Sequence, residues 1–290
     1  MNKSPDRIAI LEKIEQYELE GRFDEDVEAD PPTIPLKAGQ VDYLNVKFTS
    51  KFKTLFANIV AKLYFDFKIF KKELIIKEVC GIENYLRVKD GGVILTANHF
   101  NPFDNYAIDI TLQPHLKLKR LWKIIREGNY TSFPGLYGFL FRNCNTIPLS
   151  SSLAVWREMD AAVSRLLKRK EKLLIYPEQA MWWNYKKPRP LKPGAFNFAA
   201  KNNVPILPVF ITMEDSERIG IDGFPIQKYT INFCEPIYPK VELSQKENMK
   251  YLANKNFISW KNVYEEFYGL KLSYSCEEEN EIISYNNCNC

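Results

Sequence analysis

The chain has 290 residues, of which 46% are hydrophobic and 14% aromatic, and its net charge is +4 at pH 7. A chain of this length and composition buries one large core, or one core with a small appendage, which excludes disorder of the whole. The charge is uneven, because residues 1–31 hold four basic and ten acidic side chains, whereas residues 32–290 hold 36 basic and 26 acidic ones.

A basic body suits an anionic partner, such as an anionic membrane surface, phosphate groups or nucleic acid. The sequence shows neither the aromatic and basic signature of an RNA-binding sheet nor an arginine-rich stretch. We therefore expect no nucleic-acid partner.

The cysteines are Cys80, Cys144, Cys234, Cys276, Cys288 and Cys290. They include no pair of CxxC motifs at metal-ligand spacing, so we predict neither a disulfide framework nor a metal site. Each internal cysteine is expected to be a small buried apolar side chain. The pair Cys288 and Cys290 can bind metal or be oxidised, but a frayed tail describes it better.

Residues 1–40 are predicted to form an acidic helical leader and a linker. Ser4 and Pro5 suit the N-cap and the first position of a helix that ends at Gly21. The acidic run to Asp30 is followed by prolines, which cannot continue a helix. The leader has no apolar core segment, so we predict no signal peptide and a cytoplasmic location. Its acidity suits docking on the basic body.

Residues 41–75 contain the segment most similar to a membrane element. Apolar side chains between Lys51 and Phe70 recur at intervals of three and four, which predicts one stripe of a helix, and lysines fall largely off that stripe. Such a helix either lies in the membrane interface, with its lysines on anionic head groups, or packs its stripe on the core. No run of eighteen uncharged apolar residues occurs, which argues against a simple membrane span. The stripe contains Phe52, Leu55, Phe56, Ile59, Val60, Leu63, Phe67 and Phe70.

Residues 76–270 alternate short apolar runs with helical patterns, which predicts an α/β domain. We expect a mixed central sheet with helices on both faces, preceded by the N-terminal amphipathic helical segment. Residues 271–290 are expected to be a polar tail. The predicted strands are 93–97, 121–125, 173–176 and 206–211, with a half-exposed edge strand around 229–233. The predicted helices are 153–170, 196–201 and a last one opened by a capping box at Ser244 and Glu247.

His99 and Asp104 stand five residues apart, directly after the apolar run 93–97. The carboxylate can accept a hydrogen bond from one ring nitrogen and fix the tautomer, which leaves the other nitrogen as a general base. The second histidine, His115, follows a proline and is expected in a loop without a role. On its own, the spacing of His99 and Asp104 is more typical of a capping aspartate beside an incidental histidine.

Three further blocks follow in order along the chain. The four together are Asn98-His99-x4-Asp104, Arg126-Glu127 with Pro134 and Gly138, Tyr176-Pro177-Glu178, and Val204-Pro-Ile-Leu-Pro-Val209. In this order and spacing, from about Gly92 to Phe210, they resemble the glycerolipid acyltransferase family, which includes the lysophosphatidic acid acyltransferases.

This resemblance implies an enzyme of phospholipid synthesis that needs no cofactor and is peripheral at the inner face of the membrane. It would move a fatty acyl group from acyl-CoA or acyl carrier protein to the hydroxyl of a lysophospholipid such as 1-acylglycerol-3-phosphate. His99 and Asp104 would be catalytic, and Glu178, Arg126 and Asn101 would contact the substrate. For Arg126, pairing to Glu127 or Asp109 at the surface is an equally open interpretation.

The chain departs from the family after Glu178. The family commonly continues Pro-Glu with Gly-Thr-Arg, and the arginine is associated with an acceptor phosphate, whereas this chain has Gln179, Ala180 and Met181. Either the basic run that contains Lys186, Lys187, Arg189 and Lys192 binds the anion, or the acceptor is not the usual lysophosphatidate. Asn101 stands where the family often has serine.

The expected mechanism has His99 remove the proton of an acceptor hydroxyl, which attacks the thioester and expels the thiol. Two other classes stay open. A lipid ester or thioester hydrolase can use the same His-Asp pair to activate water, although the Gly-x-Ser-x-Gly elbow of a serine nucleophile is missing. A non-catalytic lipid-binding relative would keep the amphipathic helix with a degenerate site.

Overall fold

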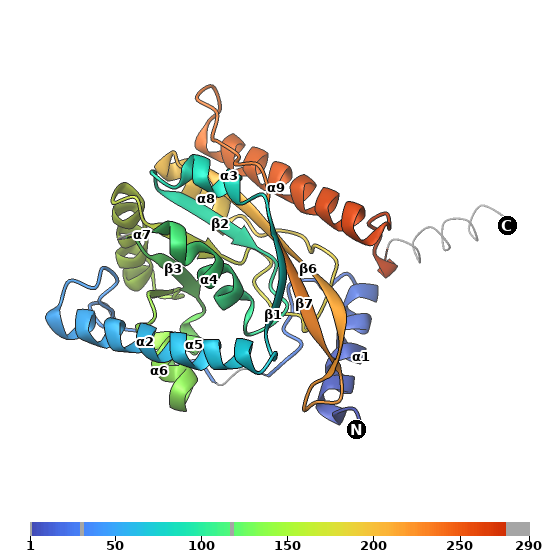
Figure 1. The fold of residues 1–290 in the computed structure, drawn as a ribbon. Helices are drawn as coiled ribbons and strands as arrows, with labels where there is room; N and C mark the ends of the chain where they lie inside the picture. The colour runs from blue at the N-terminus through green and yellow to red at the C-terminus, as the bar shows by residue number, and fades with distance from the viewer. Residues whose placement is uncertain (1, 30–31, 117–118, 277–290) are drawn as a thin grey trace.

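The computed structural model describes residues 2–29, 32–116 and 119–276, which form one central sheet flanked by helices (Figure 1). The strands are β1 (Ile75–Cys80), β2 (Val93–Ala97), β3 (Leu121–Ile125), β4 (Thr146–Pro148), β5 (Lys172–Ile175), β6 (Ile206–Ile219) and β7 (Pro225–Phe233). The helices are α1 (Pro5–Leu19), α2 (Phe48–Phe70), α3 (Ile82–Val88), α4 (Asp104–Leu116), α5 (Glu127–Thr131), α6 (Gly135–Asn143), α7 (Leu153–Lys168), α8 (Gly194–Asn202) and α9 (Gln245–Tyr268).

The seven strands lie in the order β1-β7-β6-β2-β5-β3-β4. Neighbouring strands are parallel except β6 and β7, which form an antiparallel pair. The sheet is therefore mixed, and the predicted fold class is confirmed. Strand β2 lies between β6 and β5, so the strands that precede His99 and Glu178 are neighbours in the sheet.

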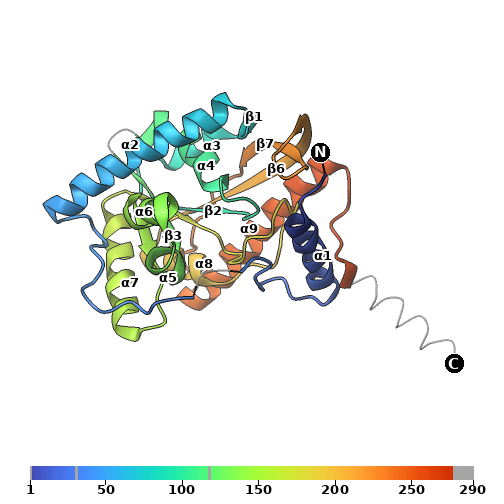
Figure 2. The same ribbon diagram turned by 90° about the horizontal axis from the view of Figure 1, so that it is seen from below.

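Helices cover both faces of this sheet, as Figure 2 shows. The side chains of β2 alternate between two core clusters: Val93 and Leu95 pack on the side of α2, α3 and α4, while Ile94 packs on the side of α7 and α8. All five residues of β2 are buried. A strand buried on both faces reads as a continuous apolar run, which explains why the sequence indicated it clearly.

The prediction of a half-exposed edge strand around 229–233 is wrong. Strand β7 lies inside the sheet, where β1 pairs with it in parallel and β6 in antiparallel orientation. The edge position belongs to β1, which the sequence analysis did not identify. Its Lys77 and Glu78 are exposed and interrupt the apolar run, so a strand pattern is hard to recognise there.

The second histidine also differs from expectation. His115 lies in the last turn of α4 and not in a loop, because the helix continues through Pro114. Its ring lies 6.4 Å from that of Tyr85.

The described cysteines are only half-buried, so they are less buried than predicted; they are Cys80, Cys144, Cys234 and Cys276. Cys288 and Cys290 lie outside the described residues.

The leader docks on the body through α1. Ile14 and Tyr17 of this helix pack with Val27, Ala180 and Trp182 in a separate core cluster. The helix starts after Ser4, as predicted, although its cap has no side-chain hydrogen bond.

Helix α2 leaves most of its predicted apolar stripe exposed, so packing of the stripe on the core is excluded. The helix contacts the body through Thr54, Ala57 and Phe65, which are buried. By contrast, Phe48 is 83% and Phe70 is 80% exposed. Within the described part of the chain, no helix is long and apolar enough to span a bilayer. Other exposed apolar residues of α2 are Phe52, Leu55, Phe56, Ile59, Leu63 and Phe67.

Candidate active site

The loop that follows β2 carries His99 and is fixed by its neighbour Asn98. The Asn98 side chain donates to the carbonyl of Ile211 at 3.0 Å and accepts from the N–H of the same residue at 2.8 Å. Asn98 is buried, so this paired bond ties the end of β2 to β6. His99 is thereby presented from a rigid strand end, where sites collect in open α/β sheets.

The Asp104 carboxylate is fully buried at the start of α4 and orients His99. The Nδ1 of His99 donates to Asp104 Oδ2 at 2.8 Å, which leaves Nε2 as the acceptor nitrogen of the neutral ring. The same oxygen accepts from the N–H groups of Phe100 at 3.1 Å and Asn101 at 3.3 Å. The His99 side chain is 23% exposed. The predicted His-Asp pair is therefore formed and accessible on one side.

Tyr176 adds a contact that the sequence analysis did not predict. Its hydroxyl donates to Asp104 Oδ1 at 2.7 Å, and its ring stacks on the His99 imidazole at 4.1 Å between centroids. Burial and the neighbouring Asp104 carboxylate raise the pKa of Tyr176 well above its usual value, so the phenol stays protonated. Both oxygens of Asp104 are thus engaged, and the imidazole is held between a carboxylate and an aromatic face.

Glu178 contacts the backbone of His99 and not its imidazole. The carboxylate accepts from the backbone N–H of His99 at 3.0 Å and from that of Arg189 at 2.8 Å. It also pairs with the Arg189 guanidinium at 3.0 Å, and both side chains are almost completely buried, at 2% and 1% exposure. The expectation that Glu178 binds the acceptor is therefore corrected: its oxygens are used by internal donors, and it positions His99.

Arg189 is likewise unavailable to a substrate anion. Besides Glu178, its guanidinium donates to the carbonyls of Phe23 at 2.9 Å and of Ala180, and it stacks on the Trp182 ring at 4.7 Å. Lys187 pairs with Glu18 of α1 at 2.6 Å. Lys187 and Arg189 of the basic run are therefore engaged in contacts with the leader and with the loop that carries Glu178.

Two other predicted substrate contacts lie outside the cavity beside His99. The exposed Lys186 lies 5.7 Å from the Tyr268 ring and does not line that cavity. The Asn101 side chain accepts from the N–H of Phe103 at 3.0 Å, a local turn bond, and it is not a lining residue either. The substrate contacts of these two residues therefore stay predictions.

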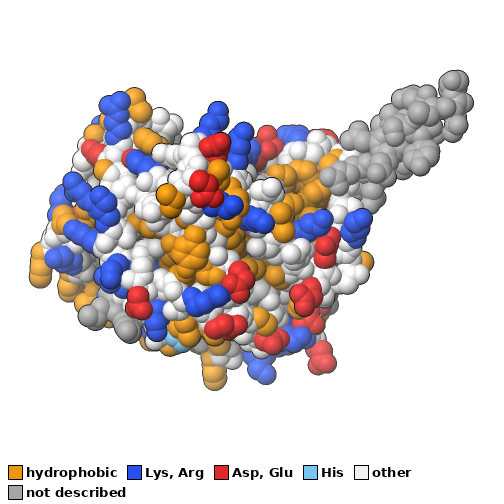
Figure 3. Space-filling model, turned by 90° about the horizontal axis from the view of Figure 1, so that it is seen from above, with side chains coloured by type: hydrophobic (Ala, Val, Ile, Leu, Met, Phe, Trp, Pro, Cys, Tyr) orange, Lys and Arg blue, Asp and Glu red, His pale blue; other side chains and the backbone are white. Residues whose placement is uncertain are grey.

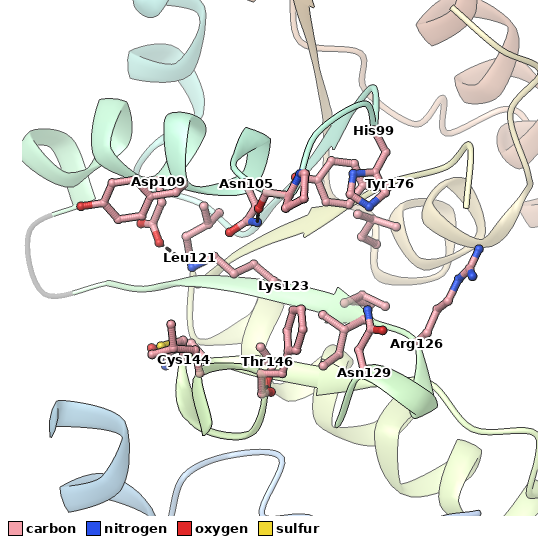
Figure 4. Close-up of a pocket in the computed structure, with 18 of the residues that line it drawn as sticks. His99, Asn105, Asp109, Leu121, Lys123, Arg126, Asn129, Cys144, Thr146 and Tyr176 are labelled. Atoms are coloured by element: carbon pink, nitrogen blue, oxygen red, sulfur yellow. Dashed lines mark hydrogen bonds and ion pairs between the residues drawn. The ribbon is translucent and has the colours of Figure 1, made fainter. Parts of the chain in front are cut away.

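A cavity of about 1280 Å³ opens at His99 and runs between β3 and helices α2, α4 and α6 (Figure 4). Its walls are largely apolar, as an acyl chain requires. The apolar lining residues include Leu55, Ile59, Phe65, Phe103, Leu121, Phe133, Leu140 and Phe141. Met181, at the position of the family's arginine, also lines it, so a thioether replaces the cation there.

Cations and leader carboxylates meet in the lining of the same cavity. Arg126 pairs with Asp26, and Lys192 pairs with Asp24, each at 2.6 Å. The hydrogen bond from Lys192 lowers the pKa of Asp24. The surface partners suggested for Arg126 in the sequence are thus replaced by an aspartate of the leader, 100 residues away.

The comparison with protein-family models agrees with the family predicted from the sequence. Residues 77–212 match the Acyltransferase family model, and this range contains all four blocks. The chain thus has an acyltransferase-family region, which confirms the family predicted from the sequence. Solved structures similar to the chain include the crystal structure of the 1-acyl-sn-glycerophosphate (LPA) acyltransferase PlsC from Thermotoga maritima. It is 20% identical, with a TM-score of 0.48 over 78% of this chain and 98% of that chain. A comparison with curated proteins gave no match.

Proposed function

We propose that the protein transfers a fatty acyl group from a thioester, acyl-CoA or acyl carrier protein, to the hydroxyl of a lysophospholipid. The observation that carries this proposal is the His99–Asp104 pair at the opening of an apolar cavity of about 1280 Å³. A base at such a site can activate a hydroxyl while the cavity holds the acyl chain.

In this mechanism the Nε2 of His99 accepts the proton of the acceptor hydroxyl as its oxygen attacks the thioester carbonyl. A new C–O ester bond forms, the C–S bond breaks, and the thiolate leaves and takes up the proton from the imidazolium. Asp104 stabilises the imidazolium, and its own position is fixed by Tyr176 and two backbone N–H groups. No acyl-enzyme is needed.

Anionic groups of the substrates have two candidate partners in the cavity lining. Arg126 and Lys192 lie there with side chains 34% and 40% exposed, and they are paired with leader carboxylates. A phosphate that binds them has to displace Asp26 and Asp24. Arg126 therefore keeps its proposed role in substrate binding, and Lys192 joins it.

Support for a membrane-bound acceptor comes from α2. Its phenylalanines and leucines are largely exposed, although Phe56 has an edge contact with Phe139, and seven lysines lie in or beside the helix. On the face shown in Figure 3, by contrast, basic, acidic and apolar side chains are interspersed. We place the protein at the cytoplasmic face of an anionic membrane, with α2 in the interface plane.

The direct test measures thiol release from acyl-CoA, and from acyl carrier protein, with a panel of lysolipids that carry or lack a phosphate. We expect release that depends on the acceptor, together with formation of a diacyl product. Release of free fatty acid without any acceptor would show a hydrolase instead. Vesicle binding without release of thiol would show a non-catalytic lipid-binding protein.

A further inference from the structure

Of the ion pairs that line the acyl cavity, the pair formed by Lys123 and Asp109 is the least exposed to solvent. Strand β3 is buried on both faces, and its residues Leu121, Lys123 and Ile125 line the cavity. Lys123 pairs there with Asp109, which comes from α4 (Figure 4). Their side chains are only 11% and 16% exposed, so the pair is largely withdrawn from solvent.

Each member of the pair has hydrogen-bonding capacity left. An ammonium has three donors and a carboxylate has two acceptor oxygens. Among the described residues, the only side-chain hydrogen bond of Lys123 or Asp109 is the one between them. Because both residues line the cavity, the remaining donors and acceptors are available to a group inside it.

Stability does not account for this pair. Replacement of a buried ion pair by apolar residues of similar volume is often neutral or stabilising, because the charges lose their hydration. An unsubstituted acyl chain would also make no use of the pair. A hydroxyl, by contrast, can donate to Asp109 and accept from Lys123 at the same time.

We propose that the pair recognises a hydroxyl group on the acyl chain, so that the preferred donor is a hydroxyacyl thioester. This rests on the proposed function. In the register of the sheet, Lys123 of β3 pairs with Leu174 of β5, and Leu174 pairs with Leu95 of β2. His99 follows Leu95 by four residues. Because His99 lies beyond the end of β2 at Ala97, the offset is at most about 13 Å along the strands, and it is about 10 Å sideways across two strand spacings. The hydroxyl is therefore in the middle of the chain and not next to the thioester.

The test compares octadecanoyl-CoA, 3-hydroxyoctadecanoyl-CoA and 12-hydroxyoctadecanoyl-CoA as donors. A hydrogen bond to a charged group contributes about 1.5–3 kcal/mol, so we expect kcat/KM to be about 10- to 100-fold higher for the mid-chain hydroxyl than for octadecanoyl-CoA. The variant Lys123→Met with Asp109→Leu should use the three donors with equal kcat/KM. Both residues are changed together, because one alone would leave a buried unpaired charge.

A matched control removes another ion pair, Lys201–Asp160, which does not line the cavity. Lys201→Met with Asp160→Leu should keep the hydroxyl preference. Equal use of all three donors by the wild type, or a preference that survives in the Lys123 and Asp109 variant, would overturn the inference.

A binding measurement separates this inference from the proposed function. Titration calorimetry with free 12-hydroxyoctadecanoate and octadecanoate needs no catalysis. We expect the hydroxy acid to bind the wild type about 10-fold or more tightly than octadecanoate, and both acids to bind the double variant equally. Equal affinities of the wild type for the two acids would reject the hydroxyl site, even if acyl transfer were demonstrated. If the wild type binds the hydroxy acid selectively but transfers no acyl group, only the proposed reaction is rejected.

Discussion

The backbone N–H of His99 donates to the Glu178 carboxylate at 3.0 Å, and this bond joins the ends of two neighbouring parallel strands, β2 and β5. Glu178 in turn is neutralised by the buried Arg189. The second acid of the site thus fixes the backbone of the loop that carries His99, while the first, Asp104, contacts the imidazole itself.

Glu178→Gln is expected to lower kcat and to leave KM for the acceptor nearly unchanged, because the residue holds His99 and does not contact the substrate. The free energy of unfolding should fall by about 3–5 kcal/mol, since Arg189 stays buried without its counter-charge. Steady-state kinetics and urea unfolding measure the two effects. A large rise in KM with unchanged kcat would instead restore Glu178 as an acceptor contact.

The leader carboxylates are expected to compete with substrate anions. Asp24→Asn with Asp26→Asn should lower KM for a phosphate-bearing substrate about 2- to 30-fold, the range for two exposed ion pairs. The control Glu12→Gln with Glu15→Gln makes the same charge change on the exposed face of α1, and KM should not move. Equal effects of both variants would mean that only the overall charge matters.

Docking of the leader should weaken in acid because of Glu18. Burial raises the pKa of Glu18, but hydrogen bonds from Lys187, Tyr185 and the N–H of Ser275 outweigh burial and lower it. A carboxyl whose pKa is lowered by folding stabilises the fold fully at pH values above its unfolded pKa of 4.5. This contribution is lost as the pH falls through the pKa of the folded state. Unfolding measured between pH 7 and pH 3 should show that loss, and Glu18→Gln should reduce it. An identical pH dependence in Glu18→Gln would contradict the assignment.

The local part of the fold and site was predictable from the sequence. Strands β2 and β3 begin and end where their apolar runs do, and the capping box of Ser244 and Glu247 opens α9 as expected. The His99–Asp104 pair spans five residues and one turn, so its geometry follows from the sequence nearby. Short or exposed edge strands, such as the three-residue β4, carry too little pattern to be recognised.

Long-range packing was not predictable, and Arg189 shows why. A cationic side chain in a basic run normally indicates a solvated surface. Here its partners come from the leader, from the loop after β2 and from its own loop, through Phe23, His99 and Ala180. The spacing of residues along the sequence indicates none of these contacts. The hydroxyl of Tyr176 on Asp104 was missed for the same reason, because 72 residues separate them.

The exposed face of α2 is expected to bind anionic vesicles. Phe48→Ser, Phe52→Ser and Phe70→Ser together should weaken binding at least about 100-fold, because each buried phenylalanine contributes about 1.5–3 kcal/mol. These side chains are 83%, 64% and 80% exposed, so thermal unfolding should hardly change. Val241→Ser, at a position 98% exposed and away from α2, is the control. Sedimentation with vesicles that leaves the triple variant bound as tightly as the wild type would exclude α2.

The central claim is that His99 is the general base of acyl transfer. The most direct measurement compares acceptor-dependent thiol release by the wild type, by His99→Ala and by His115→Gln, which alters the other histidine of the chain. We predict that His99→Ala lowers the rate about 10²- to 10⁴-fold while it keeps the wild-type circular dichroism spectrum, and that His115→Gln stays close to wild type. A folded His99→Ala variant that transfers acyl groups within a few-fold of the wild-type rate would contradict the account.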